Sequence, residues 1–211
     1  MTEELTHNLR ADAQENRDRI LDAARALFSE RGLEASMREV ARSAEVGPAT
    51  LYRRFPTKQA LIDDVFADEL RACRQIVADG CADPDPWRGF SFVIEGLSVL
   101  NVENRGFVDA FMSANPQAPV FAHHRAALLR QLAALASRAK RAGQLRHDFA
   151  IDDLVLVLLA GRGLSSTRPA TRTVAARRFA ALALDAFREN AANRTLPPKP
   201  SLVDEAVRVS R

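Results

Sequence analysis

The chain has 211 residues, enough for an all-helical body plus a small attached domain. Its formal net charge of +3 is too small to indicate nucleic-acid binding by itself, and nine glycines with few β-branched runs argue against a β-rich fold. No apolar run approaches the roughly 18–20 residues that cross a bilayer, and the polar N-terminus is not a signal peptide. We therefore expect a soluble, cytoplasmic protein without a membrane partner.

The chain begins with residues 1–15, which we expect to form a flexible arm. A helix is predicted from about Asn16 to Gly32, because apolar residues recur along one side and glycine commonly follows a helix end. The apolar stripe consists of Ile20, Leu21, Ala24, Leu27 and Phe28. This stripe offers a surface on which further helices can pack.

Residues 36–55 are predicted to form two short helices joined by a tight turn. Ser36 and Glu39 have the spacing of a capping box at the start of the first helix, and Pro48 suits the first turn of the second. Residues 36–58 carry five basic and two acidic side chains, a net charge of +3, whereas residues 1–35 carry a net charge of −3. Positive charge therefore coincides with the turn motif. We interpret the segment as a helix-turn-helix whose second helix enters the DNA major groove.

A helical wheel divides the second helix into two sides. Leu51 and Phe55 face inward as anchors, whereas Thr50 and Arg53 lie on the opposite side, where they can reach base edges. Tyr52 is predicted to contact a phosphate from the side of the helix, and Lys58 to contact a second phosphate at the start of the next helix. The full set of predicted DNA-binding residues is Ser36, Arg38, Gly47, Pro48, Ala49, Thr50, Tyr52, Arg53, Arg54 and Lys58.

The rest of the chain is predicted to be helical, which makes the fold all-α with about nine helices. Gly80 to Pro86 is the clearest boundary, and Asp85 is a predicted N-cap. The predicted helices are Lys58–Asp79, Asp85–Leu100, Arg105–Ser113, Val120–Ala142, one that contains residues 152–159, and Thr173–Ala192, with a break at Asn115–Pro116 and a loop at residues 161–172. The tail, residues 195–211, is expected to be loosely held.

The helix with the sequence LVLVLL at residues 154–159 is apolar on every side, which indicates burial by a partner as well as by its own chain. The next helix carries small residues that allow close helix approach. We predict a dimer contact from these two helices. It comprises Leu154, Val155, Leu158, Leu159, Phe179, Leu182, Ala183, Ala186 and Phe187.

The segment RILDAARALFSERGLEASMREVARSAEVGPATLYRRFPTKQALIDDV resembles the N-terminal domain of the TetR family of bacterial transcriptional regulators. Its core is VGPATLYRRFPTKQAL. Two residues depart from the family pattern: Glu45 stands where the family usually has Gly, and Ala49 stands where it often has Gly.

A second segment, RAKRAGQLRHDFAIDDLVLVLLAG, is similar to the sequence around the penultimate helix in an actinobacterial subgroup of the family. The resemblance implies a DNA-binding domain at residues 16–62 and a ligand-binding and dimerisation domain at residues 63–194. It further implies a homodimer on a palindromic operator, and most often a repressor released by a small-molecule effector.

Aromatic residues at helical spacing can line an effector pocket, although most such residues form plain core. Asn101, Arg105 and His123 are the expected polar members. The full set of pocket candidates is Phe66, Trp87, Phe90, Ile94, Leu97, Asn101, Arg105, Phe107, Phe111, Phe121 and His123.

Other kinds of site find no support in the sequence. His123 and His124 diverge by about 100° on a helix, so a shared metal is not expected, and Cys73 and Cys81 are too far apart on one helix to form a disulfide. No Gly-rich phosphate loop or Ser/His/Asp arrangement is present, so we expect no cofactor and no enzyme activity. Two alternatives remain open: a transcriptional activator, or a binding protein of this fold without specific DNA binding.

Overall fold

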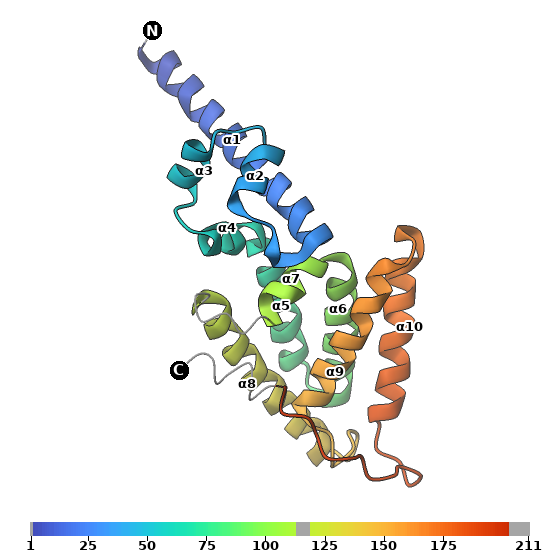
Figure 1. The fold of residues 1–211 in the computed structure, drawn as a ribbon. Coiled ribbons are helices and arrows are strands. Elements are labelled where there is room, and N and C mark those ends of the chain that lie inside the picture. Colours follow the sequence, from blue (N-terminus) through green and yellow to red (C-terminus); the bar gives the residue numbers. More distant parts are fainter. Residues whose placement is uncertain (1, 113–118, 203–211) are drawn as a thin grey trace. The chain divides into compact units, whose positions relative to one another are not determined.

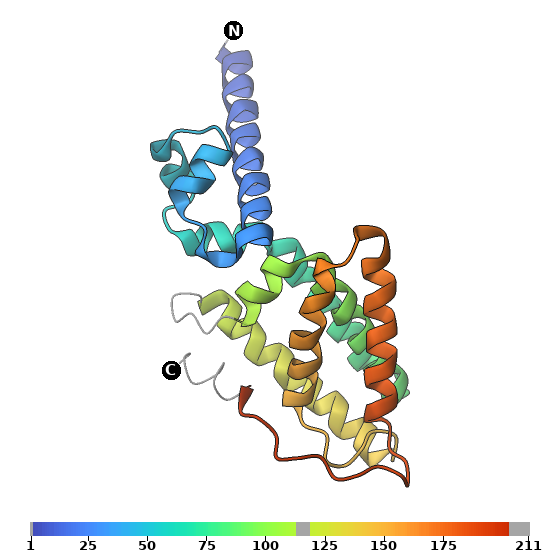
Figure 2. The same cartoon turned by 45° about the vertical axis from the view of Figure 1, so that its right-hand side comes forward.

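The computed structural model describes residues 2–112 and 119–202. Within these residues the fold is all-α, as predicted, with ten α-helices and two short 3-10 helices (Figures 1 and 2). In chain order they are α1 (Thr2–Arg31), η1 (Gly32–Glu34), α2 (Met37–Ser43), α3 (Pro48–Arg54), α4 (Lys58–Val65), α5 (Ala67–Ala82), α6 (Pro86–Glu103), α7 (Arg105–Met112), α8 (Pro119–Arg141), α9 (Ile151–Gly161), η2 (Arg162–Ser166) and α10 (Pro169–Phe187).

The chain forms two compact units, Met1–Asp68 and Glu69–Arg211. In the first unit, α2 and α4 pack against α1, and α3 packs against α2. The predicted stripe supplies the core, since Ile20, Ala24 and Phe28 are fully buried. The Phe28 ring lies 6.1 Å from that of Phe66. The first unit is therefore a small helical domain that positions α2 and α3.

The first helix is longer than predicted. It begins at Thr2, so the helix start predicted near Asn16 is wrong. That residues 1–15 move as a flexible arm stays a prediction, and Met1 lies outside the described residues. The sequence contains neither glycine nor proline before Gly32, so nothing in it stops the helix from extending towards the N-terminus. Gly32 does end α1, with a left-handed φ of 71°.

The predicted single helix Lys58–Asp79 is also wrong, because it is broken at Phe66. Phe66 has φ −108° and ψ 16°, which are not α-helical values. Its ring is buried against Phe28 in the first unit. The apolar pattern continues through Phe66, which is why periodicity alone did not reveal the break.

In the second unit, α6 is the central helix. It packs against α7, α8, α9, α10 and η2, and Phe90, Val93 and Ile94 are almost completely buried (Figures 1 and 2). Asp85 caps α6 as predicted, and one carboxylate oxygen accepts hydrogen bonds from the amides of Trp87 at 2.9 Å and Arg88 at 3.1 Å. Most helices of the second unit therefore pack against α6.

Later boundaries differ by a few residues from the prediction. Gly143 ends α8 as expected, with φ 67°. Residues 161–172 are not a plain loop, since they contain η2 and the first turn of α10, which starts at Pro169 and ends at Phe187. The predicted end at Ser113 and break at Asn115–Pro116 lie outside the described residues. No helix in the described part of the chain is both long and apolar enough to cross a membrane.

Gly80 does not end a helix, because α5 continues through it to Ala82. It instead allows α5 and α6 to approach closely. A Cβ on Gly80 would lie 2.7 Å from the Gly89 carbonyl oxygen, and a Cβ on Gly89 would lie 2.1 Å from the Gly80 oxygen. Real Cβ atoms do not tolerate such distances, so this glycine pair sets the crossing of the two helices.

We predict that Gly89→Ala lowers the free energy of unfolding by about 1–3 kcal/mol, because the added methyl group forces α5 and α6 apart. Urea denaturation of the full chain measures this change. Gly163→Ala is the matched control, since a Cβ there meets no atom within 4 Å. Equal stability of the two variants would show that the close approach is not required.

Candidate DNA interface and effector cavity

The predicted capping box is present at the start of α2. The Ser36 amide donates to Glu39 Oε2 at 2.7 Å, and the Glu39 amide donates to Ser36 Oγ at 3.3 Å. Arg31 pairs with the same carboxylate at 3.0 Å. The hydrogen bond from the Ser36 backbone is the main cause that lowers the pKa of Glu39. The box fixes where α2 begins relative to α1.

The turn between α2 and α3 contains a strained residue. Glu45 has φ 54°, in the left-handed region where glycine is preferred, and it is the one non-glycine residue in the described chain with a positive φ. Such a conformation costs on the order of 1–3 kcal/mol for a residue with a Cβ. Gly47 has an ordinary φ of −65° and serves as N-cap, with Pro48 as the first residue of α3.

The two sides of α3 divide as the helical wheel predicts. Leu51 is fully buried and Phe55 is 2% exposed, so these side chains anchor the helix. Tyr52 is 47% exposed, Arg53 and Arg54 are exposed and Thr50 is half-buried. The remaining predicted contacts in this region are exposed as well, namely Ser36, Arg38, Gly47, Pro48 and Ala49. The exposed face of α3 is therefore basic and polar, and its buried face anchors the helix to the first unit.

Lys58 is less exposed than most of the other predicted DNA-binding residues, and its side chain has a partner within the protein. Its side chain is half-buried, and its ammonium group donates to the Leu33 carbonyl oxygen after α1. An ammonium group has three donors, so it can hold this carbonyl and a phosphate together. Its first role in the structure is to tie the start of α4 to the end of α1.

The second unit encloses an apolar cavity of about 60 Å³. Four of the predicted pocket residues line it, namely Leu97, Asn101, Phe107 and Phe111. The other lining residues are Cys73, Val77, Leu100, Val108, Arg125, Leu128, Leu129, Leu132, Leu154, Val155, Leu158 and Leu202. The cavity therefore lies among five helices, α5 to α9, and the C-terminal segment closes it with Leu202.

Two polar side chains reach this apolar wall. Asn101 is 2% exposed, and its Nδ2 donates to the Leu158 carbonyl oxygen at 2.6 Å, while its Oδ1 is buried without a hydrogen-bond partner in the described structure. Such an acceptor costs about 1–3 kcal/mol. Arg125 is 3% exposed and donates from Nη1 to the Phe111 carbonyl oxygen at 2.8 Å. Burial lowers the pKa of Arg125, although a guanidinium keeps its charge.

Several predicted pocket residues lie elsewhere. Phe66 belongs to the core of the first unit, and Ile94 is buried in α6 away from the cavity. Trp87 and Phe90 join Phe149 and Phe187 in a separate aromatic cluster. Phe121 packs on Phe107 and Phe111 outside the lining set, and His123 is exposed. The side chain of Arg105 lies outside the described residues. Aromatic spacing identified packed rings but not which of them border empty space.

Arg125 lines the cavity but was not among the predicted pocket residues. It stands in HHRAALLR, where an arginine on a long amphipathic helix is normally solvated, and no local pattern marks it as buried. Cys73 was noted only as a reduced thiol. It lines the cavity, and burial raises its pKa to about 12, so the thiol is neutral.

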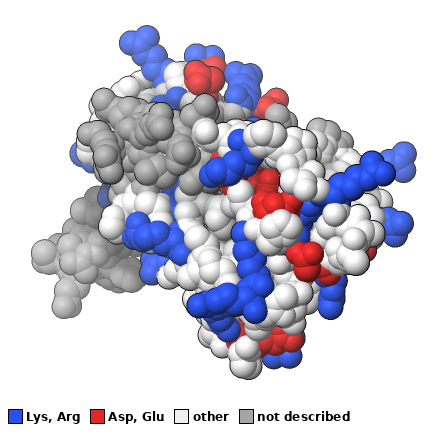
Figure 3. Space-filling view, turned by 90° about the horizontal axis from the view of Figure 1, so that it is seen from below, with Lys and Arg blue, Asp and Glu red and all other residues white. Residues whose placement is uncertain are grey.

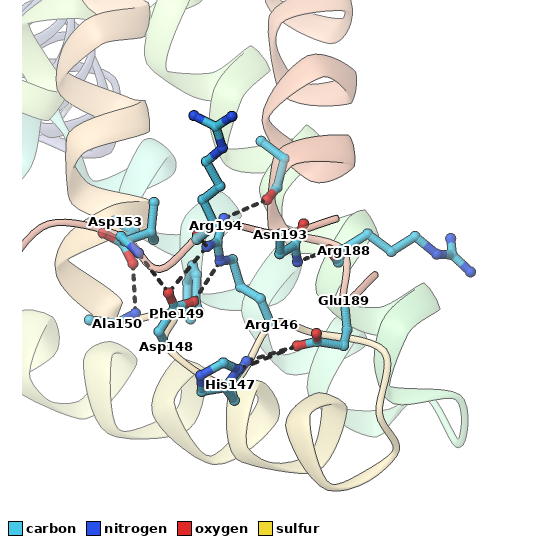
Figure 4. A network of polar contacts seen from close by, with 12 residues as sticks. Arg146, His147, Asp148, Phe149, Ala150, Asp153, Arg188, Glu189, Asn193 and Arg194 are labelled. Carbon is cyan, nitrogen blue, oxygen red and sulfur yellow. Dashed lines mark hydrogen bonds and ion pairs between the residues drawn. The ribbon is translucent and has the colours of Figure 1, made fainter. Parts of the chain in front are cut away.

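The C-terminal segment after α10 is held against the α8–α9 loop (Figure 4). Arg146 pairs with Asp148 through two hydrogen bonds of 2.6 and 3.1 Å, and it donates to the carbonyl oxygens of Ala186 and Arg194. The Leu196 amide donates to Asp148 at 2.9 Å. The expectation of a loosely held tail is therefore wrong for residues 195–202, whereas residues 203–211 lie outside the described structure. Local composition could not reveal these long-range partners.

We predict that Asp148→Asn lowers the Tm of the full chain at neutral pH, because the Arg146 guanidinium and the Leu196 amide lose their anionic partner. The paired guanidinium holds the pKa of Asp148 below its ordinary value of 3.8. The stabilisation is therefore complete above that value and is lost as the pH falls through the lower folded-state pKa.

Thermal melts between pH 7 and about pH 3 measure this contribution. The Tm gap between wild type and Asp148→Asn is expected to be widest at neutral pH and to shrink on acidification. Asp185→Asn, at an exposed carboxylate of α10, is the control and keeps the wild-type profile. A gap that is independent of pH would contradict the assigned role of the ion pair.

Comparison with known proteins covers both units. Residues 20–65 match the family described as "Bacterial regulatory proteins, tetR family", and residues 89–189 match "Transcriptional regulator SbtR-like, C-terminal domain". The HTH-type transcriptional regulator UidR of Escherichia coli K12 is 31% identical over 153 residues, which cover 67% of this chain and 74% of UidR. The chain belongs to the TetR family.

Two further relatives extend this TetR comparison. The HTH-type transcriptional repressor KstR of Rhodococcus jostii RHA1 is 50% identical over 64 residues, which cover 29% of this chain and 30% of KstR. The crystal structure of the TetR regulator SCO0520 from Streptomyces coelicolor has a TM-score of 0.50 and 31% identity, and the match covers 83% of this chain and 99% of SCO0520. Like its TetR relatives, the chain is a DNA-binding regulator of transcription.

The residues predicted for a TetR-type dimer contact fall into two groups. Leu154, Val155 and Phe187 are buried inside the protomer, so they belong to its core rather than to a contact surface. The others remain at least partly accessible, namely Leu158, Leu159, Phe179, Leu182, Ala183 and Ala186. Leu182 is 59% exposed, and Leu156 and Val174, which the sequence analysis did not select, are 43% and 69% exposed. The apolar residues of α9 thus lie on two sides of the helix. Leu154, Val155 and Leu158 line the cavity, whereas Leu156 is exposed on the outer surface.

On the face drawn in Figure 3, basic and acidic side chains lie next to one another. Mixed charge of this kind is typical of a solvated surface.

Proposed function

We propose that the chain is a repressor that binds a palindromic operator as a homodimer and is released by a small molecule. The observation that carries the proposal is the exposed face of α3, where Arg53 and Arg54 stand free while Leu51 and Phe55 fix the helix. KstR, which is similar to this chain over 64 residues, is named a repressor, and this supports repression rather than activation. The effector would occupy the cavity in the second unit.

Dimer formation is part of the proposal because one α3 helix contacts too few base pairs to select a single site. A two-fold dimer presents two such helices to successive major grooves and therefore prefers an inverted repeat. Exposed apolar side chains on α9 and α10, with Leu156 and Leu182 the clearest, would form the contact. Selection of binding sites from random oligonucleotides with the purified full chain tests the operator directly. Absence of an enriched palindrome would favour a binding protein without specific DNA recognition.

We predict that Arg53→Ala weakens binding to the selected operator by about 1–3 kcal/mol and relaxes its sequence preference, because a guanidinium in the groove pairs with base edges. Titrations on matched and scrambled duplexes at one salt concentration measure both effects. Arg130→Ala, at an exposed arginine of α8, is the control and should leave binding unchanged. An equal loss on both duplexes would instead assign Arg53 to phosphate contact.

We predict that Leu182→Arg shifts the chain from dimer to monomer, because it places a charge in the proposed apolar contact. Analytical ultracentrifugation measures the oligomeric state, and operator affinity is expected to fall with it. Ala142→Arg, at an exposed position after α8, carries the same added charge outside the contact. A Leu182→Arg chain that remained dimeric would remove α10 from the proposed interface.

A further inference from the structure

We propose that residues 197–202, here called the C-terminal flap, swing away from the second unit to open the cavity, and that the ion pair of Lys199 with Asp152 latches the flap closed. The inference rests on the proposed function only in calling the molecule that enters the cavity the effector. The closed cavity has a volume of about 60 Å³, so a wall must move before anything larger than a few atoms can enter.

The flap differs from the other walls of the cavity in how it is held. All lining residues except Leu202 belong to the helices α5–α9, and most of them are buried. Displacement of one of these helices would expose buried apolar side chains, whose burial is the main term that stabilises a fold. In contrast, no residue of the segment 188–202 is buried, and Leu202 itself is half-buried. The flap is therefore the wall whose displacement exposes the least apolar surface.

The composition of the flap also limits how it can be held. Residues 197, 198 and 200 are proline, which has no backbone N–H to donate. A proline-rich segment is extended and semi-rigid, so we expect the flap to move as one body. Within the described structure, its one polar contact with the rest of the chain joins Lys199 Nζ to Asp152 Oδ2 at 3.3 Å.

The hinge of the flap lies at Leu196, because the segment before it is anchored to the α8–α9 loop. The Arg146 guanidinium donates to the Arg194 carbonyl oxygen at 2.6 Å (Figure 4). The Leu196 amide donates to the Asp148 carboxylate at 2.9 Å. After these anchors the segment runs back past α8 and α9 (Figures 1 and 2). Motion that begins after Leu196 leaves the anchored part in place.

The ion pair of the flap has the properties of a latch. The Asp152 side chain on α9 is 4% exposed, whereas that of Lys199 is 59% exposed. Water and salt therefore reach the ammonium group, and an ion pair of this kind is weak enough to open and close. Asp152 also has another interaction within the protein, so the test changes Lys199 and leaves the carboxylate intact.

Cys73 supplies a reporter inside the cavity. It lines the cavity and is 5% exposed. Burial raises the pKa of its thiol to about 12, so the thiol is neutral and unreactive while the cavity is closed. Cys81 is the one other cysteine of the chain and is half-buried, so Cys81→Ser leaves Cys73 as the single thiol. An open flap admits both water and a small reagent to Cys73.

The experiment measures how fast N-ethylmaleimide modifies Cys73 in the DNA-free, full-length Cys81→Ser protein, with mass spectrometry as the readout. We expect Lys199→Met to speed the reaction about two- to fivefold, because the latch is lost, and Lys199→Arg to keep the slow rate. Salt raised from about 0.05 M to about 1 M should speed the reaction where Lys199 is present and have little effect in Lys199→Met.

Arg194→Met is the matched control. It removes an exposed cation from the same segment, on the anchored side of Leu196, and should keep the slow, salt-dependent rate. Equal rates in Lys199→Met and Arg194→Met would overturn the latch. The same salt dependence in both variants would overturn it as well, because salt would then act elsewhere than on the ion pair of Lys199.

The experiment also separates this inference from the proposed function. A chain that enriches a palindromic operator, but whose Cys73 rate does not respond to Lys199, retains the regulatory role and refutes the flap. A chain whose Cys73 rate responds as expected, but which enriches no operator, confirms the flap and refutes the repressor proposal. The two failures are therefore distinguishable.

Discussion

The hydrogen bond from Asn101 to the Leu158 carbonyl joins the central helix of the second unit to a helix that borders both the cavity and the exterior. At 2.6 Å it connects α6 to α9 inside an otherwise apolar region, where few alternative partners exist. It orients the amide so that its acceptor remains unsatisfied, and it helps to hold α9 so that Leu154 and Val155 face inward while Leu156 faces outward. One hydrogen bond therefore joins a cavity-lining side chain of α6 to the backbone of α9.

The first unit depends on a different kind of constraint, in which nearly every decisive contact is short-range in sequence. The capping box spans residues 36 to 39, the turn places Glu45 at a positive φ, and Leu51 and Phe55 are one helical turn apart. Longer contacts, such as that of Lys58 with Leu33 and that of Phe66 with Phe28, then tie these helices to α1. The exposed face of α3 is presented on a support that is determined mostly by local chemistry.

The C-terminal segment begins after Phe187, which belongs to the aromatic cluster of Trp87, Phe90 and Phe149, and it reaches the cavity at Leu202. The Arg146–Asp148 pair holds it beside the α8–α9 loop (Figure 4). Further along, Lys199 contacts Asp152 at 3.3 Å, and Leu202 lines the cavity. Its residues are mostly polar or proline, and they have no apolar periodicity of their own. Buried and half-buried charges elsewhere in the fold, not its own sequence pattern, hold this segment in place.

The sequence by itself determined the helix-turn-helix, because capping, turn chemistry and the inward anchors of α3 act over fewer than about five residues and leave a readable pattern. The same local logic identified the Asp85 cap, the Gly32 and Gly143 ends and the all-α class. Only the tertiary structure decided that Phe66 breaks a helix, that Gly80 marks a close crossing, that Arg125 is buried and that residues 195–202 are held in place. Each of these depends on a partner from 9 to 48 positions away, such as Gly89 for Gly80 and Asp148 for Leu196. The periodicity of apolar residues indicates which side of a helix is buried, but it does not indicate which other part of the chain packs against that side.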